Sequence, residues 1–231
     1  METSISQQIK KIVEDNLDKI LAGRLKRTLK EDNSFVTEGD MLCQNLVIDY
    51  ARSIEGGYEV VSEEMDLSSF LFDENKNYIV IDPIDGTENF TSGLKEWGVS
   101  VCVYEKGKHK ESMLLLPELG LSVITGDQTV RPEYHSRIQG ISSTSLYKEF
   151  RENLSDEGEY RLTGCSVSAM YNVVTGLFKS HEKPAKAKMW DIIAGLNLAL
   201  EHKLSVLVDG QEYQGEFLLP SKKYSFKINR V

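Results

Sequence analysis

The chain has 231 residues, of which 40% are hydrophobic and 27% charged, so it can bury the core of one large domain or of two closely packed subdomains. Its formal net charge of -9 at pH 7 argues against a broad nucleic-acid-binding face, because such a face needs clustered lysine and arginine. The excess of acids still allows a phosphorylated small molecule as partner, since bound divalent cations can reverse the local potential.

The first half of the chain is predicted to contain two helices followed by strands. Apolar side chains recur at helical spacing from Ser4 to about Ala22 and from Gly39 to Ile54, and Gly56-Gly57 ends the second helix. Short apolar runs predict strands over Tyr58–Ser62, Tyr78–Ile81, Gly98–Tyr104 and Ser112–Thr125. The run Tyr78–Ile81 has no polar alternation, which is typical of a strand buried on both faces.

From residue 138 onward strands and helices alternate, which indicates an α/β arrangement. We therefore expect an N-terminal α+β part, residues 1–137, that carries most of the candidate site, and a C-terminal α/β part, residues 138–231, that closes it. The predicted elements of the second part are strands at Ile138–Ser142, Tyr160–Thr163 and Leu204–Val208 and helices at Leu146–Leu154, Ser166–Phe178 and Trp190–Glu201. The polar segment Lys179–Lys188 is expected to be an exposed loop.

The cysteines and the N-terminal segment indicate the cellular compartment of the protein. Cys43, Cys102 and Cys165 are odd in number and widely spaced, which favours free buried thiols in a reducing compartment. The N-terminal segment has no long apolar core, and no apolar run reaches about 18 residues, so neither a cleaved signal nor a membrane span is expected. These features predict a cytoplasmic protein that does not associate with membranes.

The most informative segment is I-D-P-I-D-G-T-E-N-F, which runs from Ile81 to Phe90. A buried strand that ends in two carboxylates needs a reason, because charges near a core are costly unless they are paired or bound to a metal. Pro83 restricts Asp82 to an extended conformation, and Gly86 permits unusual dihedral angles. Such a turn can aim Asp82, Asp85 and a backbone carbonyl into one space, and hard oxygen ligands suit Mg²⁺ or Ca²⁺.

Three other acidic segments have plain structural explanations when each is taken alone. Glu63-Glu64 would be solvated surface, and Asp191 after Trp190 would cap a helix. Asp40 in Thr37-Glu38-Gly39-Asp40 would also cap a helix, and the Asp82–Asp85 turn could simply use an aspartate to cap a backbone amide. Together, however, all four place acids at strand ends or helix starts, where ligand sites gather in α/β proteins.

In combination these motifs resemble those of the inositol monophosphatase family, from about Thr37 to Val208. The family pattern is a glutamate pair, then D-P-[IL]-D-G-T, then W-D. The resemblance implies a layered α-β-α-β-α sandwich of mixed α and β structure, and a homodimer. It also implies a lithium-sensitive phosphatase that uses two or three Mg²⁺ ions and a metal-activated water to hydrolyse a small phosphorylated metabolite.

The resemblance further assigns roles to individual residues. The metal ligands would be the side chains of Glu63, Asp82, Asp85 and Asp191 and the carbonyl oxygen of Ile84. The amides of Gly86 and Thr87 would hold the phosphate, and Thr87, hydrogen-bonded to Asp40, would orient the attacking water together with Glu63. Glu64 would support the metal ligands without binding a metal itself. The segment Gly164-Cys165-Ser166, with Asp85 and Asp191, would contact the organic part of the substrate.

Two departures from the family pattern leave the substrate open. His202-Lys203-Leu204 follows Glu201 where members often have Ala-Gly-Gly, and Pro184 stands seven residues before Asp191, where inositol-selective members often have an acid. Inositol phosphate, fructose 1,6-bisphosphate, histidinol phosphate and a 3'-phosphorylated nucleotide are therefore all candidates. Two alternative interpretations are a phosphatase that uses Asp82 as a covalent nucleophile, as in the haloacid-dehalogenase type, and a non-catalytic binding member.

Overall fold

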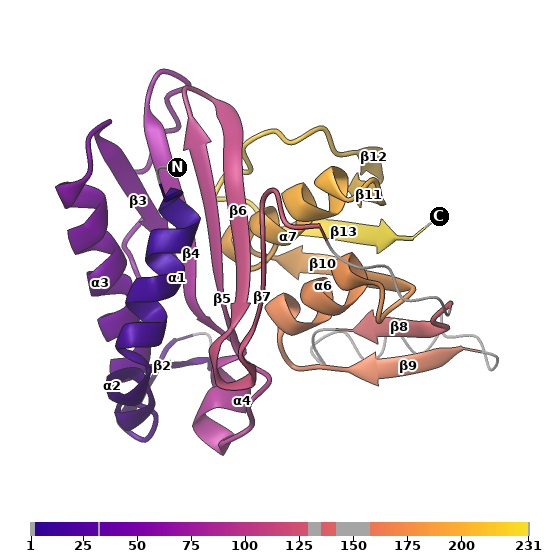
Figure 1. Cartoon of the computed structure of the whole chain (residues 1–231), viewed down its shortest axis with the longest axis horizontal. Helices are drawn as coiled ribbons and strands as arrows, with labels where there is room; N and C mark the ends of the chain where they lie inside the picture. The colour runs from indigo at the N-terminus through magenta and orange to yellow at the C-terminus, as the bar shows by residue number, and fades with distance from the viewer. Residues whose placement is uncertain (1–2, 32, 129–134, 142–157, 231) are drawn as a thin grey trace.

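The computed structural model describes residues 3–31, 33–128, 135–141 and 158–230. These residues form successive layers: in Figure 1 the N-terminal helices lie at the left, the first sheet beside them, and the remaining helices and the second sheet at the right. N-terminal helices cover a five-stranded sheet, two further helices lie between that sheet and a six-stranded sheet, and the chain ends in the second sheet. The fold is thus mixed α and β, as predicted. The helix expected at Leu146–Leu154 lies outside the described residues.

The N-terminal layer consists of α1 (Ile5–Asp15), α2 (Leu17–Ala22) and α3 (Glu38–Ser53). The single helix expected from Ser4 to Ala22 is therefore interrupted at Asn16. A hairpin that the sequence did not indicate, β1 (Arg27–Leu29) with β2 (Phe35–Thr37), connects α2 to α3. The carboxylate of Glu111 accepts hydrogen bonds from the amides of Ile5 and Ser6, at 3.2 and 2.9 Å, which docks the start of α1 against the first sheet.

The first sheet has the order β3-β4-β5-β6-β7. Its strands are β3 (Tyr58–Ser62), β4 (Asn77–Asp85), β5 (Gly98–Glu105), β6 (Lys108–Leu116) and β7 (Leu121–Ile124). Only the pair β3–β4 is parallel among these described strands. A 3₁₀ turn, Pro117–Leu119, separates β6 from β7, and a short helix that we did not predict, α4 (Thr87–Ser92), follows β4.

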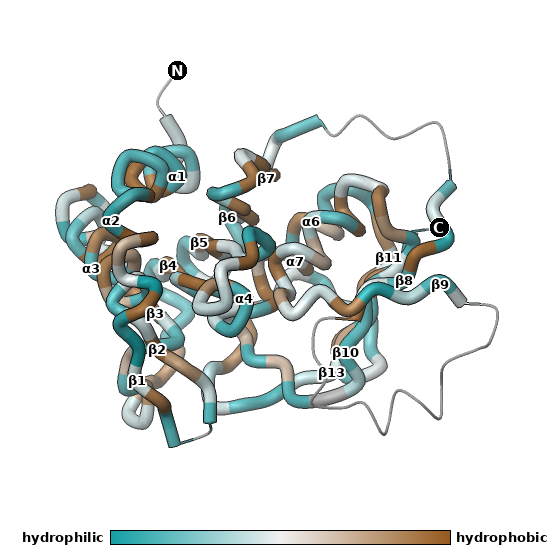
Figure 2. The backbone as a smooth tube through the Cα atoms, turned by 90° about the horizontal axis from the view of Figure 1, so that it is seen from below, coloured by the Kyte–Doolittle hydropathy of each residue, from teal (hydrophilic) through white to brown (hydrophobic). Residues whose placement is uncertain are grey.

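The central strand β4 is buried on both faces, as its apolar run predicted. Ile79 and Ile81 pack in the core beneath α1 and α3, whereas Tyr78 and Val80 pack in the core beneath α6 and α7. In Figure 2 hydrophobic stretches concentrate in these strands, between the helix layers. The strand is longer than predicted, because it continues through Pro83 to Asp85, with a shift of pairing register against β5 between Asp82 and Asp85.

The second sheet has the order β12-β11-β13-β10-β8-β9, and all its strands lie beyond residue 137. The strands are β8 (Ile138–Ile141), β9 (Glu159–Leu162), β10 (Ser180–Ala187), β11 (Ser205–Val208), β12 (Gln211–Glu212) and β13 (Tyr224–Asn229). Helices α6 (Ser166–Thr175) and α7 (Met189–Glu201) cover its inner face, and α6 ends earlier than predicted, at Gly176 in the left-handed conformation.

The prediction of an exposed loop over Lys179–Lys188 is wrong. This segment is β10, which lies inside the sheet, parallel to β8 and antiparallel to β13. The polar composition is tolerated because the strand alternates: His181 is fully buried, whereas Glu182 forms an ion pair with Lys227 on β13 at 3.0 Å. Strands β12 and β13 were also not predicted.

Candidate active site

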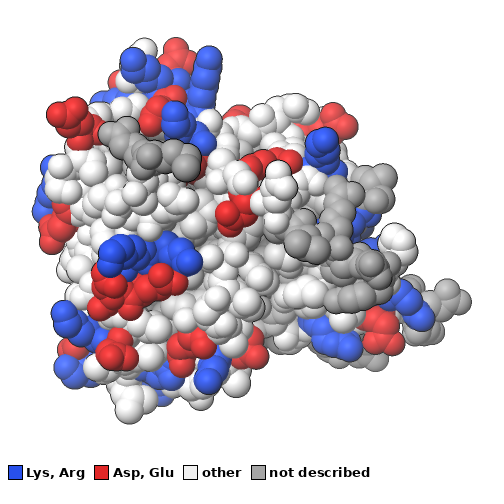
Figure 3. Space-filling view, in the orientation of Figure 1, with Lys and Arg blue, Asp and Glu red and all other residues white. Residues whose placement is uncertain are grey.

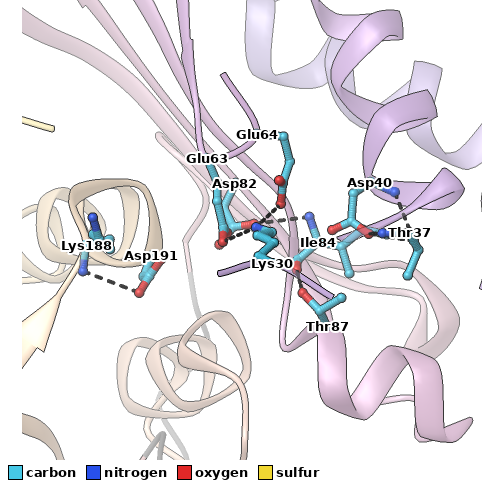
Figure 4. Close-up of polar contacts among 10 residues, drawn as sticks. All are labelled: Lys30, Thr37, Asp40, Glu63, Glu64, Asp82, Ile84, Thr87, Lys188 and Asp191. Carbon is cyan, nitrogen blue, oxygen red and sulfur yellow. Dashed lines mark hydrogen bonds and ion pairs between the residues drawn. The ribbon is translucent and has the colours of Figure 1, made fainter. Parts of the chain in front are cut away.

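Three carboxylates meet where the first sheet faces the start of α7. Glu63 directly follows β3, and Asp82 lies in β4, whose parallel pairing sets Ser62 opposite Ile81. Asp191 comes from the first turn of α7, across the cleft (Figure 4). Each of the three side chains has an oxygen within 4.8 Å of the others. The first sheet and the second helix layer thus build one cluster of acids from residues 128 positions apart at most.

Burial makes this cluster electrostatically unfavourable when its acids are ionised. Burial raises the pKa of Asp82 well above its ordinary value, and the neighbouring Glu63, Asp85 and Asp191 raise it further. Burial also raises the pKa of Asp191 to about 7, against the opposing influence of the Lys183 amine. Acids that repel one another in a buried place can bind a cation, because the cation removes the repulsion and supplies the missing partner. The cluster is therefore a candidate metal site.

Asp85 connects this cluster to the start of α6. Its Oδ2 accepts a hydrogen bond from the amide of Val167 at 2.5 Å and another from the thiol of Cys165 at 2.9 Å. Burial raises the pKa of Asp85 to about 6, although these hydrogen bonds lower it. Gly86, at φ +80°, allows the close contact, since a Cβ there would lie 2.8 Å from the Cβ of Cys165. The sequence indicated the segments around Asp85 and Cys165 as parts of the site, but not the hydrogen bonds that connect them.

The expected hydrogen bond between Thr87 and Asp40 is not formed in this part of the described structure. The Thr87 hydroxyl donates instead to the carbonyl of Ile84, at 3.1 Å. The Asp40 carboxylate accepts from the amide and the hydroxyl of Thr37, at 2.8 and 2.5 Å (Figure 4). This is a capping box at the start of α3, so the helix-capping explanation of Asp40 holds. Burial nevertheless raises the pKa of Asp40 to about 6.

A lysine that the sequence did not single out bridges the glutamate pair. The amine of Lys30, which follows β1, lies 2.9 Å from Oε1 of Glu63 and 2.6 Å from Oε1 of Glu64. Burial raises the pKa of Glu64 to about 7, and the hydrogen bond from Lys30 opposes this shift. Glu64 is thus held behind the cluster, in contact with the same lysine as Glu63. No local motif marks Lys30, because the β1–β2 hairpin brings it to the site.

A cleft of about 460 Å³ opens beside the acids. The residues that line it are Asp85, Glu88, Asn89, Leu94, Leu162, Thr163, Gly164, Ser166, Lys183 and Asp191. Gly164 and Ser166 were expected here. The side chain of Cys165 instead points to Asp85 and is buried. Asn89 connects the segment before β5 to the segment after β9, since its side-chain amide donates to the carbonyls of Glu96 and Thr163, at 2.7 and 2.8 Å. Lys183, Thr163 and Asn89 are site residues that sequence reasoning missed.

The rest of the described molecule offers three further observations. On the face seen in Figure 3, acidic and basic side chains are interspersed, without a broad basic area among the coloured atoms. No helix of the described residues is long and apolar enough to cross a membrane. The cysteines Cys43, Cys102 and Cys165 are free and buried.

Comparison with known proteins identifies the class of this site. Residues 2–128, more than half of the chain, match the model of the inositol monophosphatase family. The 3'(2'),5'-bisphosphate nucleotidase CysQ of Salmonella typhimurium is 24% identical over 210 residues, which cover 85% of this chain and 84% of that protein. A fructose-1,6-bisphosphatase/inositol-1-monophosphatase of Thermotoga maritima is 26% identical over 181 residues, or 72% of this chain and 68% of that protein.

The solved structures agree on the fold. A crystal structure of an IMPase/NADP phosphatase in complex with Mg²⁺ and phosphate superposes with a TM-score of 0.79 at 18% identity, covering 98% of this chain and 92% of that one. The protein is thus a phosphatase, a hydrolase of phosphoric monoesters. It belongs to the inositol monophosphatase family.

Proposed function

We propose that this phosphatase is Mg²⁺-dependent and hydrolyses a small phosphorylated metabolite with a metal-activated water. The observation that carries the proposal is the cluster of Glu63, Asp82 and Asp191, of which Asp82 is buried and the other two are partly buried, with oxygens within 4.8 Å of one another. Its donors are all carboxylates, which suit Mg²⁺ better than a softer metal. The related structure that contains Mg²⁺ and phosphate supports the same choice.

Two further ligands are compatible with the hydrogen bonds around the cluster. Oδ2 of Asp85 is occupied by Cys165 and Val167, which leaves Oδ1 for a cation. The carbonyl of Ile84 accepts one hydrogen bond, from Thr87, and a carbonyl oxygen has a second lone pair. These five groups provide enough oxygens for the two or three ions that we propose. When bound, Mg²⁺ would lower the pKa of a water and neutralise the charge on the phosphate.

The chain's own groups would then position the reactants. The amides of Gly86 and Thr87 would bind the phosphate, and Glu63 would hold the nucleophilic water. The Thr87 hydroxyl donates to Ile84 and so keeps its lone pairs free to accept a hydrogen bond from that water. Because Asp40 is occupied by Thr37, we now propose that it acts on the reaction only by positioning the start of α3, rather than through Thr87.

The names of the relatives indicate candidate substrates for this chain. The names of the two relatives mention bisphosphorylated nucleotides, fructose 1,6-bisphosphate and inositol monophosphate, and each is a substrate candidate for this chain. A covalent mechanism through Asp82 is disfavoured, because Asp82 is buried among the other acids of the cluster and its Oδ1 accepts the amide of Ile84 at 3.1 Å. A non-catalytic role is disfavoured, because the two relatives described above are named as phosphatases.

Phosphate release from a panel of these phosphomonoesters tests the proposal. We expect turnover with Mg²⁺, none in excess chelator, and recovery when Mg²⁺ is restored. Undiminished turnover in chelator would reject the metal mechanism. The family resemblance also predicts inhibition by lithium, and a rate that stays constant in high lithium would contradict that part alone. We further propose a homodimer in the cytoplasm, for which light scattering and cell fractionation are the measurements.

A further inference from the structure

The substrate side of the cleft contains an unexpected positive charge. Among the described residues that line the cleft, Lys183 is the only cation, whereas Asp85, Glu88 and Asp191 are acids. Its side chain exposes only 13% of its surface, so the amine lies within the cleft wall rather than in solvent. A partly buried ammonium group is costly unless an anion accompanies it.

The strand β10 determines where this lysine points. His181 and Lys183 lie on one face of the strand, and their partners on β13 are Ile228 and Phe226. Both partners belong to the core shared with α6 and α7, so this face of β10 is directed toward the helices and the cleft. Glu182 lies on the opposite face and pairs with Lys227.

The contact between Lys183 and Asp191 is weak. Its Nζ lies 4.0 Å from Oδ2 of Asp191, which is too far for a hydrogen bond. Asp191 is itself shared, because the same oxygen accepts the amide of Lys188 at 3.4 Å and the carboxylate belongs to the acid cluster. An ammonium group has three donors, so Lys183 retains donors for a ligand in the cleft.

We propose that Lys183 binds a second phosphate on the organic part of the substrate, so that this enzyme prefers small bisphosphates to the corresponding monophosphates. The inference rests on the proposed function, which assigns the reacting phosphate to Gly86, Thr87 and the metal site. The acids of the cleft would repel a second phosphate, and Lys183 offsets that repulsion where the organic part lies. The exposed Leu94 and Leu162 on the same cleft offer apolar contacts to the ring that carries both phosphates.

The test compares matched substrates at saturating Mg²⁺. The pairs are adenosine 3',5'-bisphosphate with adenosine 3'-monophosphate, and fructose 1,6-bisphosphate with fructose 1-phosphate. We expect the wild type to favour the bisphosphate of at least one pair by about tenfold in kcat/KM, as one charge-assisted hydrogen bond provides. Which pair shows the preference distinguishes a nucleotide from a sugar substrate.

The variants then assign the preference to the lysine. Lys183→Gln should reduce the ratio of bisphosphate to monophosphate kcat/KM by about tenfold, to near one, chiefly through KM, and Lys183→Arg should retain most of the preference. The matched control is Lys227→Gln, which removes a lysine from the opposite face of the same sheet and should leave the ratio unchanged.

Two results would overturn the inference while the proposed function stands. One is a wild type that hydrolyses both members of each pair equally well. The other is a Lys183→Gln variant that loses activity toward both members equally and needs more or less Mg²⁺, since Lys183 would then serve only as a counter-ion of Asp191. A wild type without activity toward any phosphomonoester would instead reject the proposed function, and the inference with it.

Discussion

The two sheets contribute opposite charges to the acid cluster and the cleft beside it, and they do so by different means. The acids of the first sheet, Glu63 and Asp82, stand in short sequence motifs, and the parallel pairing of β3 with β4 brings the two motifs together. Lys183 of the second sheet depends on long-range pairing, since β10 reaches the cleft only by lying between β13 and β8. If both proposals hold, the acid side would bind the metal and the reacting phosphate, and the lysine side would select the rest of the substrate.

Removing an acid from the first sheet should give the largest effect. Asp82→Asn keeps the size of the side chain but removes a ligand charge, so we expect kcat to fall by about 10³-fold, the upper range for loss of one key electrostatic group. The measurement is kcat at saturating Mg²⁺, with circular dichroism to confirm folding. Asp49→Asn, at an exposed position on α3, is the control and should remain near wild type. Normal turnover in Asp82→Asn would show that the acid cluster is not the metal site.

Thr87 tests whether the acid side also orients the water. Thr87→Val retains the shape and the backbone amide but removes the hydroxyl that donates to Ile84. We expect kcat to fall by about 10²-fold with KM nearly constant, which is the lower range for general-base assistance. Thr87→Ser should recover part of the rate. If Thr87→Val stays within about threefold of wild type, well below that range, the hydroxyl has only a structural role.

The pH dependence of stability tests the repulsion among the acids. In the folded protein the pKa values of Asp40, Asp85 and Asp191 are about 6, 6 and 7, all above the ordinary value near 4. Between about pH 4 and pH 7 the folded chain therefore binds more protons than the unfolded chain. Its stability should increase as the pH falls from about 7 toward 5. In chelator we expect Tm to be roughly 5 °C higher at pH 5.5 than at pH 7.5, about 2 kcal/mol for a chain of this size.

Mg²⁺ provides the control for that measurement. A bound cation removes the penalty of ionised carboxylates and binds best when they are deprotonated, so it should stabilise the protein more at pH 7.5 than at pH 5.5. A Tm in chelator that rises with pH over this range would mean that the acids are stabilised by other groups when ionised.

The smallest expected effect concerns the capping box of α3. Thr37→Val removes the hydroxyl that accepts from the amides of Gly39 and Asp40, so the free energy of unfolding should fall by about 1 kcal/mol. Urea denaturation measures it. Because Asp40 contacts Thr37 and not Thr87, effects of Asp40→Asn and Thr87→Val on kcat should multiply independently. If the effects of the two substitutions on kcat are strongly coupled, Asp40 and Thr87 act through a direct contact, as the sequence predicted.

Sequence reasoning succeeded where the signal was local. The helical periodicity of α3 and the uninterrupted apolar run of β4 predicted those elements, because each pattern reflects contacts that the element makes along its own length. It failed for β10, whose polar residues are satisfied by β13 across the sheet, and for β13 itself. It also misplaced the partner of Asp40, since the capping box at Thr37 and a contact with Thr87 were both compatible with the sequence.

The sequence alone was enough to identify the acids of the candidate site, which are Glu63, Asp82, Asp85 and Asp191. Those residues stand in short motifs at strand ends and helix starts, where a few neighbours fix the backbone that presents them. Only the tertiary structure decided which basic side chains accompany them. Lys30 and Lys183 reach the site through a hairpin and a sheet strand, and a lysine with a long flexible side chain leaves no local pattern to indicate where its charge will lie.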